Sequence, residues 1–361
     1  MKFQLKTRQV CLFFIAFMPV IKFFMMPSVI ADFAREDMWI SSLINLILDG
    51  ITLSFLIFAC KKARTKFFEL LEDNFGMVGA KIILSLYFVY FMLKAIVPLG
   101  EQKDYVELTL YTLMPSQLYF LPFFAVAFYF CLKYLRVIGR SADVLWILTA
   151  VGILILFALS IPHAEFEAVL PLGANGITNI LKGSYSTLNW YGDCVYLMFF
   201  IGEFKYKNKD GIKIFISYLI AAVAVIFFMI IFYSVFTSIA FRQRFALTEI
   251  SKYTAVINNI GRFDYVGIVF ILFSNAFALS LPLFFSCRIL NYIFGITKKW
   301  IAPIIVIAIQ LGIMVLLTEY YASIESFIEN YAGVYFLILG NIFPIIAAFL
   351  KNKEAKNENY A

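Results

Sequence analysis

Charge is scarce in this sequence. Only 15% of the 361 residues are Asp, Glu, Lys or Arg, whereas 63% are hydrophobic and the mean hydropathy is +0.88. An average soluble domain has roughly 25% charged residues, so this composition predicts an integral membrane protein. The same composition excludes a disordered chain, a small secreted protein held by disulfides and a nucleic-acid-binding protein. Basic residues beside membrane spans explain the net charge of +7 better than nucleic-acid binding does.

Metal ligands and enzyme motifs are also lacking. The chain has one histidine, His163, and five isolated cysteines, none of which is paired at the spacing of a metal site or a disulfide framework. The sequence contains no P-loop, nucleophile elbow, zinc-protease motif or dinucleotide-binding glycine fingerprint. We therefore expect no enzymatic activity, no metal and no cofactor.

Long apolar runs, by contrast, are abundant. A helical span needs about 20 apolar residues, and these runs are too long for the strands of a barrel. The prediction is a single all-α transmembrane domain over residues 1–350 and a disordered cytoplasmic tail over 351–361. The ten predicted spans are roughly 10–31, 39–60, 81–99, 116–137, 143–161, 187–203, 212–240, 265–287, 300–318 and 331–350.

The basic residues are divided unequally between the two sides of the membrane. With these spans, 21 Lys and Arg residues lie on the side of the N-terminus and eight, Lys94 among them, on the opposite side, while Lys22 lies within a span. Because cytoplasmic segments carry the excess of Lys and Arg, both termini are predicted to be cytoplasmic. Two outer segments stand out: 162–186 is too polar to span, and 241–264 forms either a helical hairpin over the spans or a plain loop.

The first span has an unusual composition. It contains Pro19, Lys22 and Pro27, and two prolines flanking a lysine predict a break in the helix. Broken helices are tolerated in a membrane only where they are buried in protein or line a cavity. A lone ammonium at that depth costs at least ~2.5–3.5 kcal/mol, so Lys22 needs a partner, water or a neutral form.

The candidate partners are Asp49 in the second span and Asp193 in the sixth. The outer half of the sixth span is rich in Ser, Thr, Asn and Gly, including Asn189 and Gly192, which predicts a second interrupted helix. Interruptions in spans one and six would occupy corresponding positions of two five-span halves. Paired interruptions of this kind are typical of a transporter binding site at the interface of inverted repeats.

Simpler interpretations remain open for each of these features. Lys22 with Asp49 or Asp193 could be a structural ion pair, and the polar residues of span six could serve helix packing. Ser274 and Asn275 in span eight fit packing better than ligand contact, and Tyr90 in span three fits the core better than a pocket. The acidic residues after span three fit a solvated loop face better than a catalytic pair; they are Glu101, Asp104 and Glu107.

Five short motifs, in order along nearly the whole chain, resemble those of the spore germination permeases, the B subunits of bacterial spore germinant receptors. They are MMPSVIADFAREDMWIS with Pro27, Ser28, Trp39 and Ser41; YVELTLYTLMPSQLYFLPF; IGRSADVLW with Asp143 in the acidic place; VLPLGANGITNILKGSYS; and GRFDYVGIVF with Arg262, Phe263 and Asp264. Each motif alone is weak, but five in the right order in a chain with ten spans make a fairly specific match.

That family is similar to the amino acid–polyamine–organocation transporters. The resemblance implies a LeuT-type 5+5 inverted repeat with broken helices 1 and 6, and a small-nutrient pocket between spans 1, 3, 6 and 8. It also implies an A subunit and a lipoprotein C subunit as partners, in the inner membrane of the spore. The residues expected at the pocket are Val20, Lys22, Phe23, Tyr90, Asn189, Gly192, Asp193, Ser274 and Asn275.

One departure from the family pattern concerns the first break. Val20 and Lys22 stand where the family usually has a Gly-x-Gly-like stretch, whose glycines would let the backbone unwind around a ligand. Our hypothesis is that the Lys22 ammonium takes the place of a ligand amine or a coupling cation, balanced by Asp193 or Asp49. The chain would then prefer a ligand without an amine, or bind none.

The predicted function is that of a nutrient-sensing membrane subunit in spore germination, in which ligand binding shifts a two-state equilibrium. The main alternative is a proton-coupled transporter of amino acids or other small organic solutes, with Lys22 and an aspartate as the proton relay. An ion-conducting subunit is a third interpretation, and a membrane enzyme a distant fourth.

Overall fold

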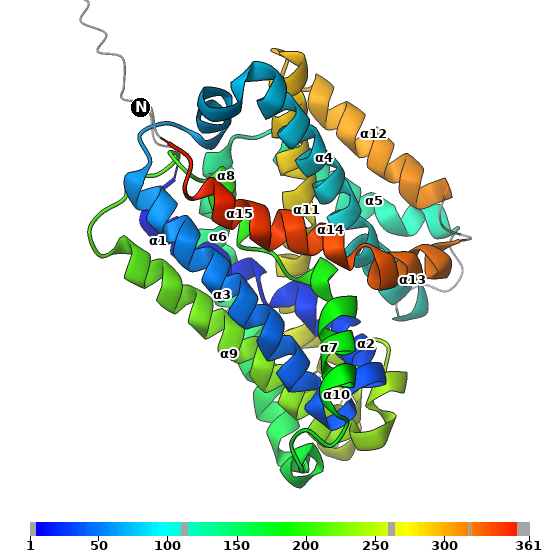
Figure 1. The fold of residues 1–361 in the computed structure, drawn as a ribbon. Helices are drawn as coiled ribbons and strands as arrows, with labels where there is room; N and C mark the ends of the chain where they lie inside the picture. Colours follow the sequence, from blue (N-terminus) through cyan, green and yellow to red (C-terminus); the bar gives the residue numbers. More distant parts are fainter. Residues whose placement is uncertain (1–4, 110–114, 259–263, 317, 319, 352–361) are drawn as a thin grey trace, which may run out of the picture.

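Helices account for nearly all the regular structure of the chain (Figure 1). The computed structural model describes residues 5–109, 115–258, 264–316, 318 and 320–351. Within these ranges no strand is formed beyond an isolated bridge between Leu5 and Phe204. The α-helices are α1 (Thr7–Phe17), α2 (Met26–Ala34), α3 (Met38–Lys62), α4 (Phe67–Thr109), α5 (Leu121–Cys131), α6 (Leu135–Ser160), α7 (Ile177–Ser186), α8 (Val195–Phe199), α9 (Asp210–Phe236), α10 (Ala246–Asn258), α11 (Asp264–Phe294), α12 (Ile301–Leu316), α13 (Tyr321–Tyr331), α14 (Gly333–Leu337) and α15 (Phe343–Ala347).

Five helical stretches of the described residues are long and apolar enough to cross a membrane. A sixth span arises if the pair Ser323–Tyr331 and Gly333–Ala347, which is bent by 56°, counts as one. Two shorter apolar helices, Leu118–Cys131 and Ile301–Leu316, are also present. The first long stretch, Met26–Lys62, contains both α2, the second half of the interrupted first span, and α3; divided there, and with the interrupted sixth span added, the helices follow the order of the ten predicted runs. The five long stretches are Met26–Lys62, Phe67–Glu107, Leu135–His163, Asp210–Arg242 and Leu272–Phe294.

The first span is interrupted, as its prolines predict. Helix α1 ends at Phe17, a short 3₁₀ helix covers Val20–Phe23, and α2 begins at Met26. Pro19 directly precedes the 3₁₀ turn, and Pro27 stands in the first turn of α2, where a missing N–H costs nothing. Lys22 therefore lies on the 3₁₀ turn, in the middle of the break.

The sixth span is also interrupted, but it begins earlier than predicted. Helix α7 forms its outer half within 162–186, the segment predicted to be a polar loop, and the break lies between α7 and α8. The polar composition of α7 misled the prediction because α3 satisfies its polar groups. The Ser184 hydroxyl donates to Asn45 Oδ1 at 2.7 Å, and Ser41 Oγ and Asn45 Nδ2 donate to the backbone carbonyls of Ile180 and Ser184 at 2.8 and 2.9 Å. Helix α7 thus packs against α2 and α3 (Figure 1).

The outer segment 241–264 contains one helix, α10, after a 3₁₀ turn over Thr237–Arg242. Helix α10 packs against α2, α6, α9 and α11, so it covers the spans as a single helix in the described part of the segment. Arg262 and Phe263 of the last family-like motif lie outside the described residues, as does 352–361 of the predicted tail.

Two departures from α-helical geometry lie within long helical stretches, one in α4 and one in span ten. Helix α4 turns at Gly76, whose φ of +71° suits glycine. Between α14 and α15 the chain forms a π turn over Ile338–Ile342, which contains Gly340 and Asn341. A single π turn inside an α-helix is a frequent feature of functional sites, and this one faces the break in span six.

Candidate functional site

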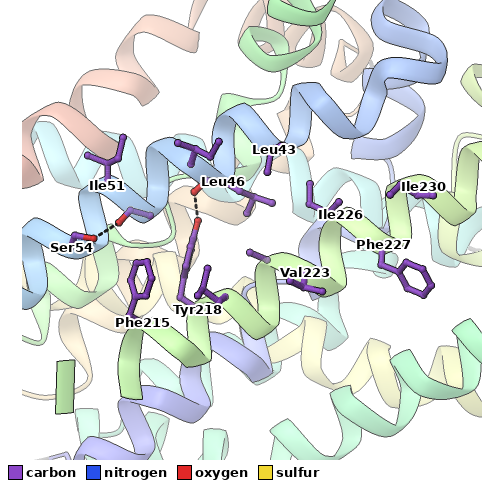
Figure 2. A pocket seen from close by; sticks show the side chains of 14 residues that line it. Leu43, Leu46, Ile51, Ser54, Phe215, Tyr218, Val223, Ile226, Phe227 and Ile230 are labelled. Atoms are coloured by element: carbon purple, nitrogen blue, oxygen red, sulfur yellow. Dashed lines mark hydrogen bonds between the residues drawn. The ribbon is translucent and has the colours of Figure 1, made fainter. Parts of the chain in front are cut away.

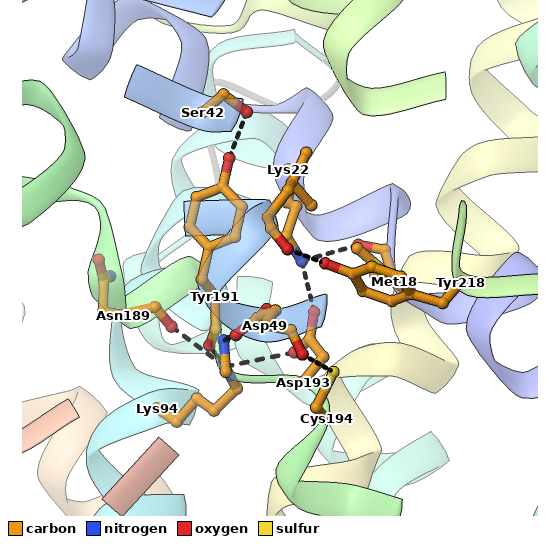
Figure 3. A network of polar contacts seen from close by, with 12 residues as sticks. Met18, Lys22, Ser42, Asp49, Lys94, Asn189, Tyr191, Asp193, Cys194 and Tyr218 are labelled. Atoms are coloured by element: carbon orange, nitrogen blue, oxygen red, sulfur yellow. Dashed lines mark hydrogen bonds and ion pairs between the residues drawn. The ribbon is translucent and has the colours of Figure 1, made fainter. Parts of the chain in front are cut away.

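Lys22 joins the two interrupted spans (Figure 3). Its ammonium donates to the Met18 carbonyl at 3.0 Å, within its own break, and forms an ion pair with Asp193 Oδ2 in the break of span six. The ammonium also lies 5.1 Å from the centre of the Tyr191 ring, within cation–π range. A carbonyl, a carboxylate and an aromatic face therefore surround this cation.

Lys94 holds the backbone of the second break in place. Its ammonium donates to the carbonyls of Asn189, at 3.3 Å, and Tyr191, and lies 3.3 Å from Asp193 Oδ1. The prediction that Lys94 is one of the outer cations is wrong, because the residue is 4% exposed within α4. Without it the Lys and Arg asymmetry is 21 to seven, so the predicted orientation is unchanged.

Asp49 holds the same break from the opposite side. Its two carboxylate oxygens accept the Gly192 N–H at 3.1 and 3.0 Å, and Oδ1 also accepts from Asn341 Nδ2 at 2.9 Å. Asn341 belongs to the π turn and bonds Thr52 Oγ1 at 3.1 Å as well. Span ten is therefore tied to span two at the height of the break in span six.

Glycine is required at the centre of this second break. Gly192 has φ of +76°, and a Cβ added there would lie 2.9 Å from the Tyr90 hydroxyl and 3.4 Å from Gly340 Cα. The positive φ and the Tyr90 hydroxyl therefore both disfavour a side chain here, and the Gly340 backbone lies at van der Waals contact. Tyr90, predicted at the pocket, covers this contact.

Three of the four ionisable groups are in direct contact, because Asp193 pairs with both Lys22 and Lys94, and Asp49 joins them through the Gly192 backbone (Figure 3). Lys22, Lys94, Asp49 and Asp193 are each 6% exposed or less, and their formal charges sum to zero. A buried ion pair is retained at a cost unless its geometry and further hydrogen bonds offset desolvation. Here backbone groups of the two breaks supply those hydrogen bonds, so the broken helices and the charges stabilise each other.

The other predicted site residues fall into two groups. Val20 and Phe23 are buried, and the Phe23 ring packs on Phe228 with centroids 4.4 Å apart, away from the charges. Ser274 accepts from or donates to Thr149 Oγ1 at 2.7 Å, and Thr149 reaches the Ala16 carbonyl of α1.

Three predicted residues keep unused hydrogen-bonding capacity. Both amide atoms of the Asn189 side chain, Oδ1 of Asn275 and the Tyr90 hydroxyl are buried without a hydrogen-bond partner. An unsatisfied buried polar group costs about 1–3 kcal/mol. These atoms are therefore the groups of the predicted site that a ligand could satisfy.

The acidic residues after span three do not form a solvated face. Glu101 is 1% exposed and accepts the indole N–H of Trp190 at 2.7 Å. Asp104 is paired with Lys103 at 3.1 Å and with Arg244 at 2.9 Å. The predicted loop continues as α4, so these groups are partnered within the protein.

A groove lies between α3 and α9 (Figure 2). It has a volume of about 570 Å³ and is lined by Leu, Ile, Val, Ala and Phe side chains. Its polar members, such as Tyr218 and Ser54, bond backbone carbonyls of α3. The groove contains none of the four charged residues, so it does not suit a polar nutrient.

No metal site is found among the described residues, since no three His, Cys, Asp or Glu side chains lie close enough together to hold a metal ion.

Comparisons with known proteins agree with this architecture. A family model described as "Spore germination protein" matches residues 4–323. The manganese transporter of Eremococcus coleocola, in the structure of a point mutant, shares the fold, with a TM-score of 0.61 and 12% identity over 95% of this chain and 78% of that one.

A second similar structure is Mhp1, a nucleobase-cation-symport-1 family transporter in a closed conformation with bromovinylhydantoin bound. It has a TM-score of 0.58 and 15% identity over 87% of this chain and 72% of that one. No curated protein matches the sequence. The predicted LeuT-type fold with interrupted helices 1 and 6 is confirmed by these likenesses, and the family and both neighbours are of permease or transporter type.

Proposed function

This chain belongs to the spore germination protein family, and on that premise we propose that it is the membrane subunit of a nutrient germinant receptor. In this proposal a small, amino-acid-like nutrient binds between spans 1, 3, 6 and 8 and triggers germination. The observation that carries the proposal is the buried contact between Lys22 and Asp193, which joins two broken helices in a transporter fold.

Binding between the two breaks offers a mechanism for signalling. A ligand shifts a two-state equilibrium only through contacts that differ between the states. Lys22 and Asp193 lie on separate halves of the fold and touch directly, so a ligand that changes their contact changes how the halves pack. Asn189, Asn275 and Tyr90 supply the polar atoms that still lack partners.

Lys22 narrows the class of nutrient in this proposal. Its ammonium already lies between the Met18 carbonyl and the Asp193 carboxylate, where a ligand amine or a coupling cation would otherwise find its acceptors. Among amino-acid-like nutrients, those without a free amine are therefore favoured. The proposed partners are an A subunit and a lipoprotein C subunit, in the inner membrane of the spore.

A matched pair of variants tests the proposed site. Asn189 and Gln310 are both buried, and the side-chain amides of both lack hydrogen-bond partners, but Gln310 lies in α12, outside the predicted site. Asn189→Leu and Gln310→Leu should each leave the folded protein intact, since each removes an unsatisfied amide. Spores of a strain without other germination permeases would be exposed to amino acids, amine-free acids, sugars and nucleosides.

The expected result is loss of response to one nutrient when the chain is deleted. Asn189→Leu should raise the half-maximal concentration of that nutrient about threefold to tenfold, the value of one hydrogen bond. Gln310→Leu should not change it, at equal protein levels by immunoblot. Unchanged germination of the deletion strain with every nutrient would overturn the receptor proposal, and equal shifts in both variants would overturn the site.

A proton-coupled transporter of small organic solutes is the second candidate. The observation that favours it is the buried set of two lysines and two aspartates in a fold shared with transporters. Robust concentrative uptake of a labelled solute by the purified chain in proteoliposomes, abolished by dissipating the proton gradient, would support this candidate over the receptor.

A further inference from the structure

A polar hollow lies at the opposite end of the spans from α7 and α10. It has a volume of about 180 Å³ and is bounded by the end of α5, the start of α6, the last turns of α11 and the segment before α12. Lys133, Tyr134, Arg288, Asn291 and Lys299 supply its polar lining. It shares no residue with the network around Lys22 and Asp193.

Positive charge exceeds negative charge around this hollow. Lys133 and Lys299 are exposed, and each ammonium lies 4.8 Å from the centre of a tyrosine ring, Tyr129 and Tyr134 respectively. In the described part of the chain, neither lysine has a carboxylate within ion-pair distance. Glu203 is the nearby acid, and it is already shared between Arg288 at 3.0 Å and Lys66 at 3.3 Å.

One guanidinium nitrogen of Arg288 has no hydrogen-bond partner in the protein and is available to a ligand. Its Nη2 donates to Glu203 Oε1, whereas Nη1 is buried without a hydrogen-bond partner. Asn291 Oδ1, one turn further along α11, is also buried and unpartnered. A guanidinium with free N–H groups in a fixed fork is well matched to the oxygens of a phosphate, and two flanking ammonium groups add to that match.

The hollow lies at the level expected for lipid headgroups. Tyr134 and Trp300 beside it are 59% and 54% exposed, and exposed Tyr and Trp are typical of the membrane–water interface. The lysine and arginine asymmetry predicts that this end faces the cytoplasm. Basic pockets between spans on the cytoplasmic side bind anionic headgroups.

We propose that this hollow binds the phosphate diester of an anionic phospholipid from the cytoplasmic leaflet. Arg288 Nη1 donates to a phosphate oxygen, and Lys133 and Lys299 flank the headgroup. The lipid would link the α5–α6 connection, in the first half of the fold, to the α11–α12 connection in the second. A free phosphate-bearing solute has the same headgroup chemistry, so the test must separate the two sources.

The test uses the full chain, purified in a zwitterionic detergent, with thermal unfolding followed as lipids are added. The probes are phosphatidylglycerol, phosphatidylcholine and inorganic phosphate. Because Arg288→Gln would leave Glu203 without its partner, the variant of choice is Lys133→Gln with Lys299→Gln, which keeps the Arg288–Glu203 pair. Lys298→Gln is the matched control, since Lys298 is exposed and adjacent but does not line the hollow.

Phosphatidylglycerol should raise the unfolding temperature of the wild-type chain, and phosphatidylcholine should not. Each lysine removed should weaken the apparent affinity for phosphatidylglycerol about fivefold, whereas Lys298→Gln should leave it unchanged. Equal protection by both lipids, or equal weakening in the control, would overturn the proposal. Protection by inorganic phosphate equal to that by the lipid would overturn the lipid assignment in favour of a soluble anion.

Discussion

The breaks in spans one and six are built differently. In span one the freed Met18 carbonyl is satisfied by Lys22, a residue of the same break. In span six the freed groups are satisfied from outside: Asp49 of α3 accepts the Gly192 N–H, and Lys94 of α4 donates to the Asn189 and Tyr191 carbonyls. The first break is bonded from outside as well, since Thr149 of α6 donates to the Ala16 carbonyl and the Ala246 N–H of α10 donates to the Phe24 carbonyl. The difference is that Lys22 belongs to the break whose Met18 carbonyl it satisfies, whereas Asp49 and Lys94 reach the second break from α3 and α4.

This difference shows where motion can be transmitted. A change at the break of span six must disturb α3, α4 and the π turn of span ten, because all three hold it. The break of span one reaches that set through the Lys22–Asp193 pair. Asp193 therefore connects the first break, through Lys22, to the second break, which α3, α4 and span ten hold in place.

The largest expected effect comes from removing the Asp193 carboxylate, which pairs with both lysines. Asp193→Asn leaves the ammonium groups of Lys22 and Lys94 without their shared carboxylate, and breaking a buried pair costs about 3–5 kcal/mol. Thermal unfolding of the detergent-solubilised protein should show this loss. Adding Lys22→Met should recover part of it, because one of the two uncompensated charges is removed. A double variant less stable than Asp193→Asn would contradict the pairing.

An intermediate effect is expected at the glycine of the second break. Gly192→Ala forces a Cβ into a positive-φ conformation and against the Tyr90 hydroxyl, which should cost about 1–3 kcal/mol. Gly312→Ala in α12, where no atom lies within 4 Å of the added Cβ, is the matched control and should not destabilise the protein. Adding Tyr90→Phe should relieve only the steric part. Equal unfolding temperatures for the two alanine variants would show that the second break does not need its glycine.

The smallest expected effect concerns the hydrogen bond between Thr52 and Asn341, which reaches the second break only through Asp49. Thr52→Val removes the hydrogen bond between Thr52 and Asn341 but leaves Asn341 bonded to Asp49. Interhelical hydrogen bonds in membranes average about 0.6 kcal/mol, so unfolding should change little. Asn341→Leu, which also removes the bond to Asp49, should cost more than Thr52→Val. The reverse order would show that Asp49 does not need span ten.

Features that follow from local chemistry were predictable from the sequence. The length of the apolar runs predicted most of the spans, and the prolines on either side of Lys22 predicted the first break. Gly192 and Asp193 marked the second, although its outer half-helix, α7, was taken for a loop. That error arose because polar residues in a membrane look like a loop until another helix, here α3, is known to bond them.

Features that depend on tertiary contact were not predictable. Lys94 lies near the end of its span, and only the fold shows that it turns inward to the carbonyls of span six. Glu101 resembled a solvated acid, yet Trp190 donates to it in the interior. The π turn that brings Asn341 to Asp49 has no signal in the sequence, because its extra residue is selected by what it packs against.

The zero formal charge of the Lys22, Lys94, Asp49 and Asp193 set has an electrical consequence. Moving one elementary charge through the membrane potential involves about 2.3 kcal/mol per 100 mV. If the set shifts as one body, the potential does no net work on it, so such a movement is insensitive to voltage. Separating Lys22 from Asp193 along the membrane normal displaces a cation relative to an anion, and only that separation would register as a gating current.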